Sequence, residues 1–353
     1  MLLTSFKYKT PNWEISRLTN LGAANLLVGQ NASGKSRTIH ALESTAHFMR
    51  AVKSLHAESD FSVEITFLTE DSTPSKLEYS FSVKNEKITK ELLKKDNHTI
   101  LRRSGATAIL EGDPVNPPEN KLITQVRRDK KLYPEIERLM EWAEGVTAIS
   151  FSDINPFTNA LGPSLQINPK LFSDLVSEFT SSEKKMFLKE AREIGYSVSD
   201  IRCSAFRDYK FVEIKENYIK SPVAEFNLSN GMIRVLYVLA YLIKMKNRTT
   251  TSLLLIDDLG EGLDYKKVVK LGEKVFLLCQ TSGVQIIATS NDSHLMDIVD
   301  ISKWQILNCN RSKVTSLNAS THPDLFNAFR LTGLSNYDFF SSDFIDNFLK
   351  NSR

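Results

Sequence analysis

The chain has 353 residues, of which 41% are hydrophobic and 25% are charged, and its formal net charge is +3. These proportions are close to the averages of globular proteins, so they exclude a mainly disordered or fibrous chain. The longest apolar run, near 235–243, is far shorter than the roughly 20 residues that span a bilayer.

No basic region followed by a long apolar segment stands at the N-terminus, so we expect no signal peptide. The three cysteines, Cys203, Cys279 and Cys309, are an odd number at scattered spacings. This pattern favours free thiols in a reducing compartment over disulfides or a zinc site. We therefore expect a soluble, cytoplasmic protein without a membrane segment.

The N-terminal part of the chain alternates like short strands, which are predicted at 2–8, 13–18 and 25–28. The last of these is a continuous apolar run, as expected for a strand that is covered on both faces of a sheet. A helix is predicted over 35–55. Two further strands are predicted over 61–67 and 77–83.

The middle of the chain is less regular and locally basic. Residues 84–131 contain 12 Lys and Arg against 7 Asp and Glu. This segment is either a solvated lysine-rich helix or hairpin, or a surface that contacts a phosphate backbone. Turn residues cluster at 113–118. Helices are then predicted over 134–144 and 169–194, followed by a strand near 204–214.

From residue 228 the pattern becomes compact and apolar. A buried helix is predicted over 231–245, a strand over 252–256, a helix over 265–278 and a strand over 284–288. Such alternation of strands and helices predicts a parallel α/β sheet. We expect one domain, with a core from about 1–60 and 205–310, an inserted α+β lobe over about 61–204, and a tail over about 311–353.

The strongest motif is a complete G-x-x-x-x-G-K-[ST] at 29–36, between the apolar strand 25–28 and a predicted helix. Its glycines allow backbone N–H groups to point at phosphate oxygens. Lys35 would reach the β- and γ-phosphates, and the Ser36 hydroxyl would bind Mg²⁺. The candidate ATP-binding residues are Gly29, Gln30, Asn31, Ala32, Ser33, Gly34, Lys35, Ser36 and Arg37.

Two carboxylates, Asp257 and Asp258, end the apolar strand 252–256. Beside a P-loop, Asp257 would hold Mg²⁺ through water and Asp258 would orient or deprotonate the attacking water. Taken alone, the same pattern fits a strand that runs into an acidic turn. Further upstream, Ser229 and Gly231 begin the buried helix, where Ser229 is an ordinary N-cap or part of a second phosphate-binding nest.

The order and spacing of these motifs resemble the ATP-binding-cassette (ABC) ATPases, in the bacterial branch near the overcoming-lysogenization-defect and structural-maintenance-type proteins. Residues 25–36 resemble Walker A, 228–231 the signature motif, 253–258 Walker B, 262–264 the D-loop, and 286–292 the last core strand with its switch region. The resemblance covers roughly 1–50 and 205–300. It implies an ABC ATPase head, a P-loop NTPase fold with an inserted lobe, that uses ATP and Mg²⁺.

The resemblance also implies a homodimer. In this family two heads enclose two ATP molecules, and each P-loop faces the signature motif of the other chain. Ser229 and Gly231 would then contact ATP from across the dimer.

Several positions depart from the family pattern. Asp258 stands where the family has its catalytic glutamate, and Asn291 stands at the switch-histidine position, where an amide can hydrogen-bond a phosphate but cannot carry a proton. His294 either substitutes for that histidine or caps a surface helix. Gln125 is either the glutamine-loop residue or a solvated polar residue. With Lys35, Asp258 and Asn291 as the candidate catalytic residues, these departures imply slow turnover.

About 50 residues follow Asp300, too few for the Toprim domain of the nuclease relatives, and no heptad run predicts a coiled-coil arm. The resemblance therefore implies a sensor or scaffold ATPase of a bacterial anti-phage defence system that has a separate effector chain. One alternative is a DNA-binding repair or recombination ATPase that grips duplex through 84–131. A third is the cytoplasmic subunit of a membrane transporter.

The C-terminal stretch 337–349 is rich in aromatic residues. Ser342 or Asp343 is expected to cap a short helix that places Phe344, Phe348 and Leu349 near one face. These side chains either pack on the protein's own core or dock on a second subunit or an effector.

Overall fold

The computed structural model describes residues 1–51, 60–151, 172–207, 209–246 and 252–351. The end of the predicted helix 35–55 and the start of the predicted helix 169–194 lie outside these residues. Within the described ranges, no helix combines the length and the apolar character needed to cross a membrane. None of the three cysteines forms a disulfide within the described ranges.

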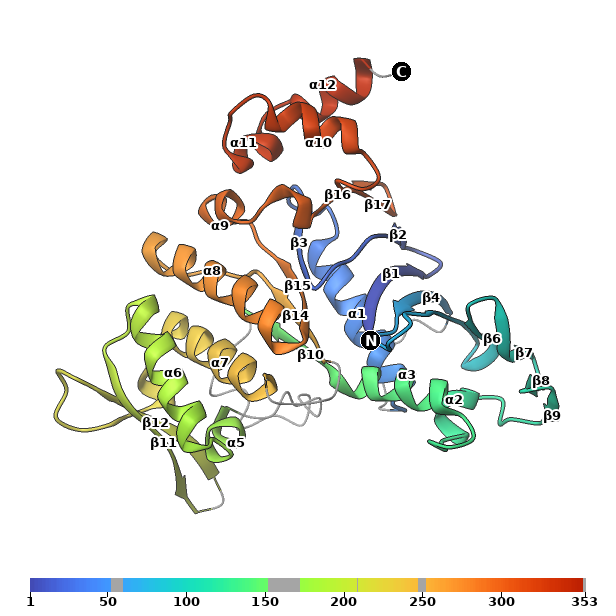
Figure 1. Cartoon of the computed structure of the whole chain (residues 1–353), viewed down its shortest axis with the longest axis horizontal. Coiled ribbons are helices and arrows are strands. Elements are labelled where there is room, and N and C mark those ends of the chain that lie inside the picture. The colour runs from blue at the N-terminus through green and yellow to red at the C-terminus, as the bar shows by residue number, and fades with distance from the viewer. Residues whose placement is uncertain (52–59, 152–171, 208, 247–251, 352–353) are drawn as a thin grey trace.

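Among the described residues, a sheet of 14 strands forms the centre of the molecule (Figure 1). In spatial order its strands are β10, β14, β15, β3, β16, β17, β2, β1, β4, β5, β6, β7, β8 and β9. In chain order their bounds are β1 (Leu2–Lys9), β2 (Glu14–Leu18), β3 (Ala24–Val28), β4 (Phe61–Leu68), β5 (Lys76–Lys84), β6 (Lys87–Lys95), β7 (His98–Ser104), β8 (Thr107–Leu110), β9 (Asp113–Val115), β10 (Val146–Ser150), β14 (Ser252–Asp257), β15 (Val284–Thr289), β16 (Trp304–Asn310) and β17 (Lys313–Leu317).

The strands β10, β14, β15, β3 and β16 run parallel. β17 pairs antiparallel with β16 and parallel with β2. From β2 through β1 to β4–β9, neighbouring strands pair antiparallel. All five residues of β3 are buried. Successive side chains of a strand point to opposite faces, so Leu26 and Val28 join one hydrophobic core and Leu27 joins the other. The expected α/β fold, with β3 as an interior strand that is covered on both faces, is confirmed.

Helices cover both faces of the parallel part of the sheet. The helices are α1 (Lys35–Met49), α2 (Ile123–Val126), α3 (Pro134–Gly145), α5 (Phe172–Ser177), α6 (Ser181–Ile194), α7 (Asn230–Met245), α8 (Tyr265–Ser282), α9 (Ser293–Ile298), α10 (Pro323–Arg330), α11 (Asn336–Ser341) and α12 (Phe344–Asn351). Residues of α7 and α8 belong to the same core as Leu26, and residues of α1 and α3 to the same core as Leu27. The result is a three-layer α/β/α arrangement.

Residues 61–204, expected to form one inserted lobe, instead contribute to three regions. β4–β9 continue the central sheet as a meander, and β10 pairs in parallel with β14 at its other end. The described part from α5 onward lies outside this sheet but shares the hydrophobic core of α7 and α8. There, β11 (Val198–Phe206), β12 (Tyr209–Glu216) and β13 (Val223–Ala224) make a three-stranded sheet beside α5 and α6.

Two predicted elements are each divided in the structure. The single strand expected near 204–214 is the β11–β12 hairpin, which turns at Arg207 with a positive φ of 53°. The single helix expected over 169–194 is broken before α6, where Thr180 and Glu183 form a capping box. A capping box satisfies the free N–H groups of a helix start, which explains why α6 begins anew at this point.

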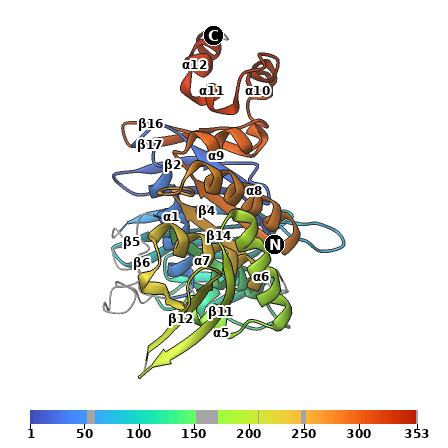
Figure 2. The same ribbon diagram turned by 90° about the vertical axis from the view of Figure 1, so that its left-hand side faces the viewer.

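The C-terminal helices α10, α11 and α12 gather at one end of the molecule, and the β11–β12 hairpin projects at the opposite end (Figures 1 and 2). α12 begins at Phe344, as the capping pattern predicts. Phe339 is fully buried, and its ring lies 4.4 Å from that of Phe329 and 4.9 Å from that of Phe326. These contacts favour packing of the tail on the protein's own core.

Replacing Phe339 by alanine should lower the free energy of unfolding by about 3–5 kcal/mol, because the change removes buried apolar surface and leaves a cavity among the aromatic rings. Chemical denaturation measures this change. Leu331→Ala is the matched control, because Leu331 is 89% exposed and its loss should change stability by no more than about 0.5 kcal/mol. Equal stability of the two variants would show that α11 does not stabilise the fold.

Candidate functional site

The carboxyl ends of four parallel strands meet at one edge of the sheet, where ligands bind in open α/β folds. β3 leads into the loop 29–34, β14 ends at Asp257, and β15 ends at Thr289. β10 ends at Ser150, which pairs with Asp257, and the following residue Phe151 donates its N–H to the Asp257 carbonyl at 2.9 Å. The predicted phosphate and Mg²⁺ residues are therefore gathered at this edge.

The loop between β3 and α1 has the backbone geometry of an anion nest. Ala32 and Gly34 both have positive φ angles, 64° and 97°, and alternation of left- and right-handed residues turns successive N–H groups toward one point. A Cβ at position 34 would lie 2.7 Å from Cγ2 of Val314 and 3.6 Å from Trp13, so only glycine fits there. Gln30, Asn31, Ala32 and Arg37 are exposed.

Lys35 begins α1 and is 7% exposed. Its ammonium donates to the carbonyl oxygens of Gly29 at 2.5 Å and Gln30 at 3.2 Å, which closes the loop on itself. Burial lowers the pKa of Lys35, and the charges of Asp258 and Asp257 act in the opposite direction. The lysine thus lies within electrostatic reach of both carboxylates, although β15 separates β3 from β14 in the sheet.

Thr289 at the end of β15 links the two carboxylate residues. Its hydroxyl donates to Oδ1 of Asp257 at 2.6 Å and accepts the backbone N–H of Asp258 at 2.8 Å. Thr289 is fully buried and Asp257 is 6% exposed. The threonine therefore fixes the Asp257 side chain in one orientation, as partners of metal-binding carboxylates do.

Asp258 has a positive φ of 55°. Aspartate and asparagine are enriched in this left-handed conformation, whereas longer side chains adopt it less readily. The backbone at this position therefore favours aspartate where the resembling family has glutamate. The carboxylate is half-buried and lies next to the buried Asp257.

Ser229 and Gly231 stand at the start of α7. The Ser229 hydroxyl accepts the N–H of Met232 at 3.3 Å, so Ser229 is the N-cap of the helix. A Cβ at position 231 would lie 2.8 Å from Leu263 and 3.3 Å from the carbonyl oxygen of Gly262. The start of α7 is thus packed against the loop that follows β14, and both Ser229 and Asn230 are exposed.

The other candidates are placed as follows. Asn291 is exposed two residues beyond Thr289 at the same sheet edge. His294 lies in the first turn of α9, whose N-cap is Asp292, and its ring packs edge-on against Tyr265 at 4.4 Å.

Gln125 donates to the carbonyl of Phe48 at 2.6 Å. Since Phe48 is near the end of α1, Gln125 is about 20 Å along the helix from the P-loop, too far for a glutamine-loop role.

The residues at this edge fit a nucleotide and Mg²⁺. The Ser33 hydroxyl and the Trp13 indole N–H are buried without a hydrogen-bond partner among the described residues. Buried polar atoms are normally paired, so these two point to a polar ligand or water.

Trp13 also lines a groove of about 550 Å³ with Lys9, Glu14 and Lys313, beside the phosphate-binding loop. Ser36 and Asp257 would hold Mg²⁺, and the loop would hold phosphates.

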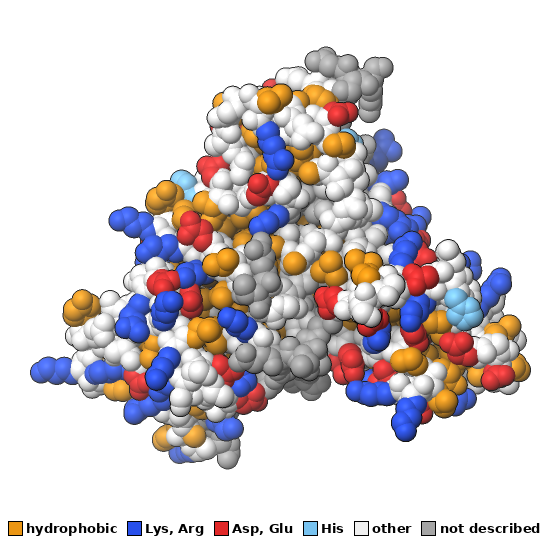
Figure 3. All heavy atoms as spheres, in the orientation of Figure 1, with side chains coloured by type: hydrophobic (Ala, Val, Ile, Leu, Met, Phe, Trp, Pro, Cys, Tyr) orange, Lys and Arg blue, Asp and Glu red, His pale blue; other side chains and the backbone are white. Residues whose placement is uncertain are grey.

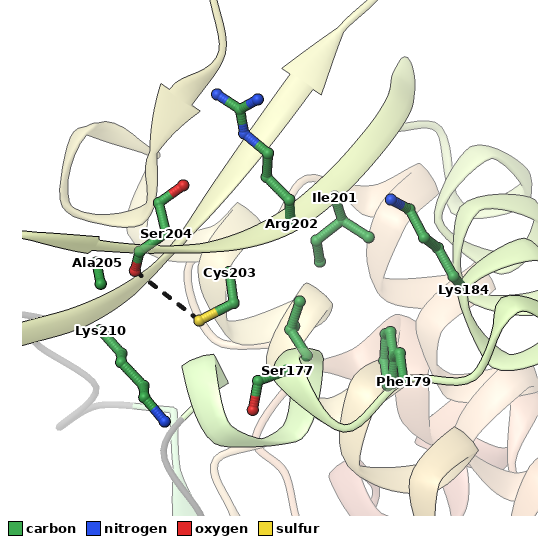
Figure 4. Close-up of a pocket in the computed structure, with 10 residues that line it drawn as sticks. Ser177, Phe179, Lys184, Ile201, Arg202, Cys203, Ser204, Ala205 and Lys210 are labelled. Atoms are coloured by element: carbon green, nitrogen blue, oxygen red, sulfur yellow. Dashed lines mark hydrogen bonds between the residues drawn. The ribbon is translucent and has the colours of Figure 1, made fainter.

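A second hollow, of about 490 Å³, lies between α5, α6 and β11 (Figure 4). Ile201 and Cys203 point from β11 toward Ser177 and Phe179. Burial raises the pKa of the Cys203 thiol, so the thiol stays protonated and lacks the reactivity of a thiolate. We assign no chemistry to this pocket.

The comparisons with known proteins agree with this geometry. Residues 159–297 match the family described as an AAA domain, putative AbiEii toxin, of type IV toxin–antitoxin systems. The matched range contains Ser229, Gly231, Asp257 and Asp258, and the P-loop lies outside it. No curated protein sequence matches the chain.

Among solved structures, the chain is similar to an SMC head bound to the C-winged helix domain of ScpA, with 13% identity, a TM-score of 0.57, and coverage of 92% of this chain and 100% of that one. It is also similar to the Smc head with an extended coiled coil bound to the C-terminal domain of ScpA from Pyrococcus furiosus. That pair has 12% identity, a TM-score of 0.56, and coverage of 93% and 99%.

The chain therefore has the fold of the ABC-type P-loop ATPases. Over most of its length this fold is that of the SMC heads, and residues 159–297 in addition match the AAA-domain family model. This bears out the resemblance that the motifs suggested.

Sequence reasoning missed two residues of the site. Thr289 lay inside the recognised stretch 286–292, but its role depends on a partner more than 30 residues away. Trp13 belongs to the turn between β1 and β2, and its contact with the P-loop depends on the antiparallel pairing of these strands. An aromatic residue at a strand turn carries no local signal for such a contact.

Thr289→Val should weaken Mg·ATP binding by about tenfold, because the isosteric change removes the hydrogen bond that orients Asp257. It should also lower the free energy of unfolding by about 1–3 kcal/mol, because the buried Asp258 N–H loses its acceptor. Titration calorimetry and denaturation measure the two effects. Thr289→Ser keeps the hydroxyl and should resemble the wild type; equal losses in both variants would contradict the role of the hydroxyl.

Proposed function

We propose that the chain binds Mg·ATP at this sheet edge and hydrolyses it slowly. The observation that carries the proposal is the convergence of Lys35, Asp257 and Asp258, which are distant in sequence and are brought within electrostatic reach beside an anion nest. Ionisable groups that are gathered in this way beside an anion nest are typical of functional sites.

Each residue has a distinct role in this proposal. Lys35 exchanges its carbonyl partners in the loop for β- and γ-phosphate oxygens, and Ser36 and Asp257 hold Mg²⁺, which neutralises phosphate charge. Asp258 orients the attacking water and accepts its proton. Asn291, an exposed amide at the same edge, donates a hydrogen bond toward the γ-phosphate.

Slow turnover is expected on physical grounds. Asp258 is one methylene shorter than a glutamate, and Asn291 cannot take up a proton at any accessible pH. The site therefore keeps the groups that bind nucleotide and has weakened forms of those that position water. We expect turnover below about 1 s⁻¹, at the slow end of the usual enzyme range.

The second part of the proposal is nucleotide-dependent pairing of two copies. Ser229 and Asn230 are exposed and begin a helix, where N–H groups and the helix dipole favour a phosphate. Ser229 of one copy would face the γ-phosphate held by the P-loop of the other. A slowly hydrolysing pair suits a switch, so we infer a sensor or scaffold role with a separate effector chain. The AbiEii-type family description supports a defence or toxin–antitoxin context.

Lys35→Ala should abolish tight ATP binding, because it removes the positive charge that meets the β- and γ-phosphates. Isothermal titration with Mg·ATP measures the loss, which we expect to exceed about 100-fold. Lys270→Ala is the control, since Lys270 is an exposed lysine of α8. Unchanged affinity in the Lys35 variant would refute the P-loop assignment.

Asp258→Asn should preserve ATP binding and lower hydrolysis by about tenfold or more, because the amide is not a base. Asparagine tolerates the left-handed backbone of this position as well as aspartate does, so the variant isolates the carboxylate. We also expect it to accumulate the paired state with Mg·ATP, which light scattering after size exclusion detects. Wild-type hydrolysis by this variant would mean that another group orients the water.

A further inference from the structure

The basic segment 84–131 has no part in the nucleotide site, and the structure shows where its charges lie. β4–β7 form part of the antiparallel meander, and their register places Glu64, Ser80, Leu92 and Arg102 side by side across the sheet. We call this side of β4–β7 the open face. Its side chains are exposed or half-buried, whereas most of those on the opposite side are buried against α1 and α3.

We propose that the open face binds the phosphate backbone of duplex nucleic acid. The proposal goes beyond the ATPase function and does not depend on it. Lys90 and Lys94 lie on either side of Leu92 on β6, and Arg102 lies opposite Leu92 on β7. These three cations, the open-face triad, form the centre of the surface.

The ion pairs of the region single out this triad. On the open face, Glu64 is paired with Lys7 and Arg17. Glu78 lies opposite Lys94 in the register but forms its ion pair with Lys76. The carboxylates of the open face therefore already have cationic partners. Lys90, Lys94 and Arg102 form no ion pair within the described ranges of the chain. An unneutralised cluster of like charges on one surface attracts a polyanion.

The spacing of the triad suits a nucleic-acid strand. Lys90 and Lys94 are four residues apart on one strand, a separation of about 13 Å. One strand of a duplex carries a phosphate per roughly 3.4 Å of helix axis, so the triad spans about four phosphates. Around it, Ser80, Ser82 and Ser104 supply short hydroxyl groups, which bond phosphate oxygens without reading sequence.

The surface favours a duplex over a single strand. Proteins that bind single strands stack bases on exposed aromatic rings. The aromatic residues of β4 and β5 instead point to the buried side, where Phe61 and Phe81 pack around Phe48 of α1 and Phe67 packs on Trp142 of α3. The open face of these strands offers charges and hydroxyls but no stacking platform.

The test is binding of a labelled DNA duplex of about 30 base pairs, followed by fluorescence anisotropy without nucleotide. The test variant is Lys90→Glu/Lys94→Glu/Arg102→Glu. Its control is Lys185→Glu/Lys266→Glu/Lys270→Glu, which reverses three exposed lysines of α6 and α8 and lowers the net charge equally. Thermal unfolding and Mg·ATP titration verify that both variants are folded.

We expect wild-type affinity to fall by about 40-fold between about 50 and 200 mM salt, as three phosphate contacts predict. The test variant should lose at least about tenfold in affinity at low salt and most of this salt dependence, while the control changes little. Absence of wild-type binding at low salt, equal weakening by the control, or tighter binding of a single strand would overturn the proposal. Lys35→Ala should bind the duplex normally, which separates this result from the ATPase proposal.

Discussion

The hydrogen bonds of the Thr289 hydroxyl connect two neighbouring parallel strands at the point where their chemistry is needed. β14 and β15 bring Asp257 and Thr289 to the same sheet edge, and the hydroxyl then fixes both the Asp257 carboxylate and the Asp258 backbone. Because the threonine is fully buried, water does not compete for these bonds. The position of the proposed Mg²⁺ ligand and that of the water-orienting carboxylate thus depend on one side chain.

The parallel core and the P-loop could be predicted from the sequence because their signals are local. A continuous apolar strand, a glycine-containing loop and a helix follow one another over residues 25–49, and each has a recognisable composition. The same holds for β14 with its two terminal carboxylates. The functional residues of each segment are contiguous in the sequence. They can therefore be predicted without knowing how the strands pair.

The meander was harder to predict. β6 has the sequence KITKELLKK, in which lysine, glutamate and leucine are good helix formers. It is a strand because Leu93 and Ile88 fill the core beside α1 and α3, a tertiary effect that overrides propensity. The β11–β12 turn was equally difficult to predict. Hairpin turns are recognised by glycine or asparagine at left-handed positions, whereas this turn has Arg207 in the left-handed conformation. The break before α6 was also missed, although Thr180 and Glu183 carry the local sequence signal of a capping box.

The lack of a side chain at Gly231 has a mechanical consequence. It allows α7 to touch Leu263, and the Arg234 guanidinium adds a hydrogen bond to the Glu261 carbonyl at 3.2 Å. These contacts couple the start of α7 to the loop, and we refer to the two together as one body. In the pair that we propose, this body has Asp258 at one end, next to the chain's own nucleotide, and Ser229 at the other, next to the nucleotide of the second copy. Hydrolysis of ATP in one site would then shift a contact in the other. ATP hydrolysis in the two sites would therefore be coupled rather than independent.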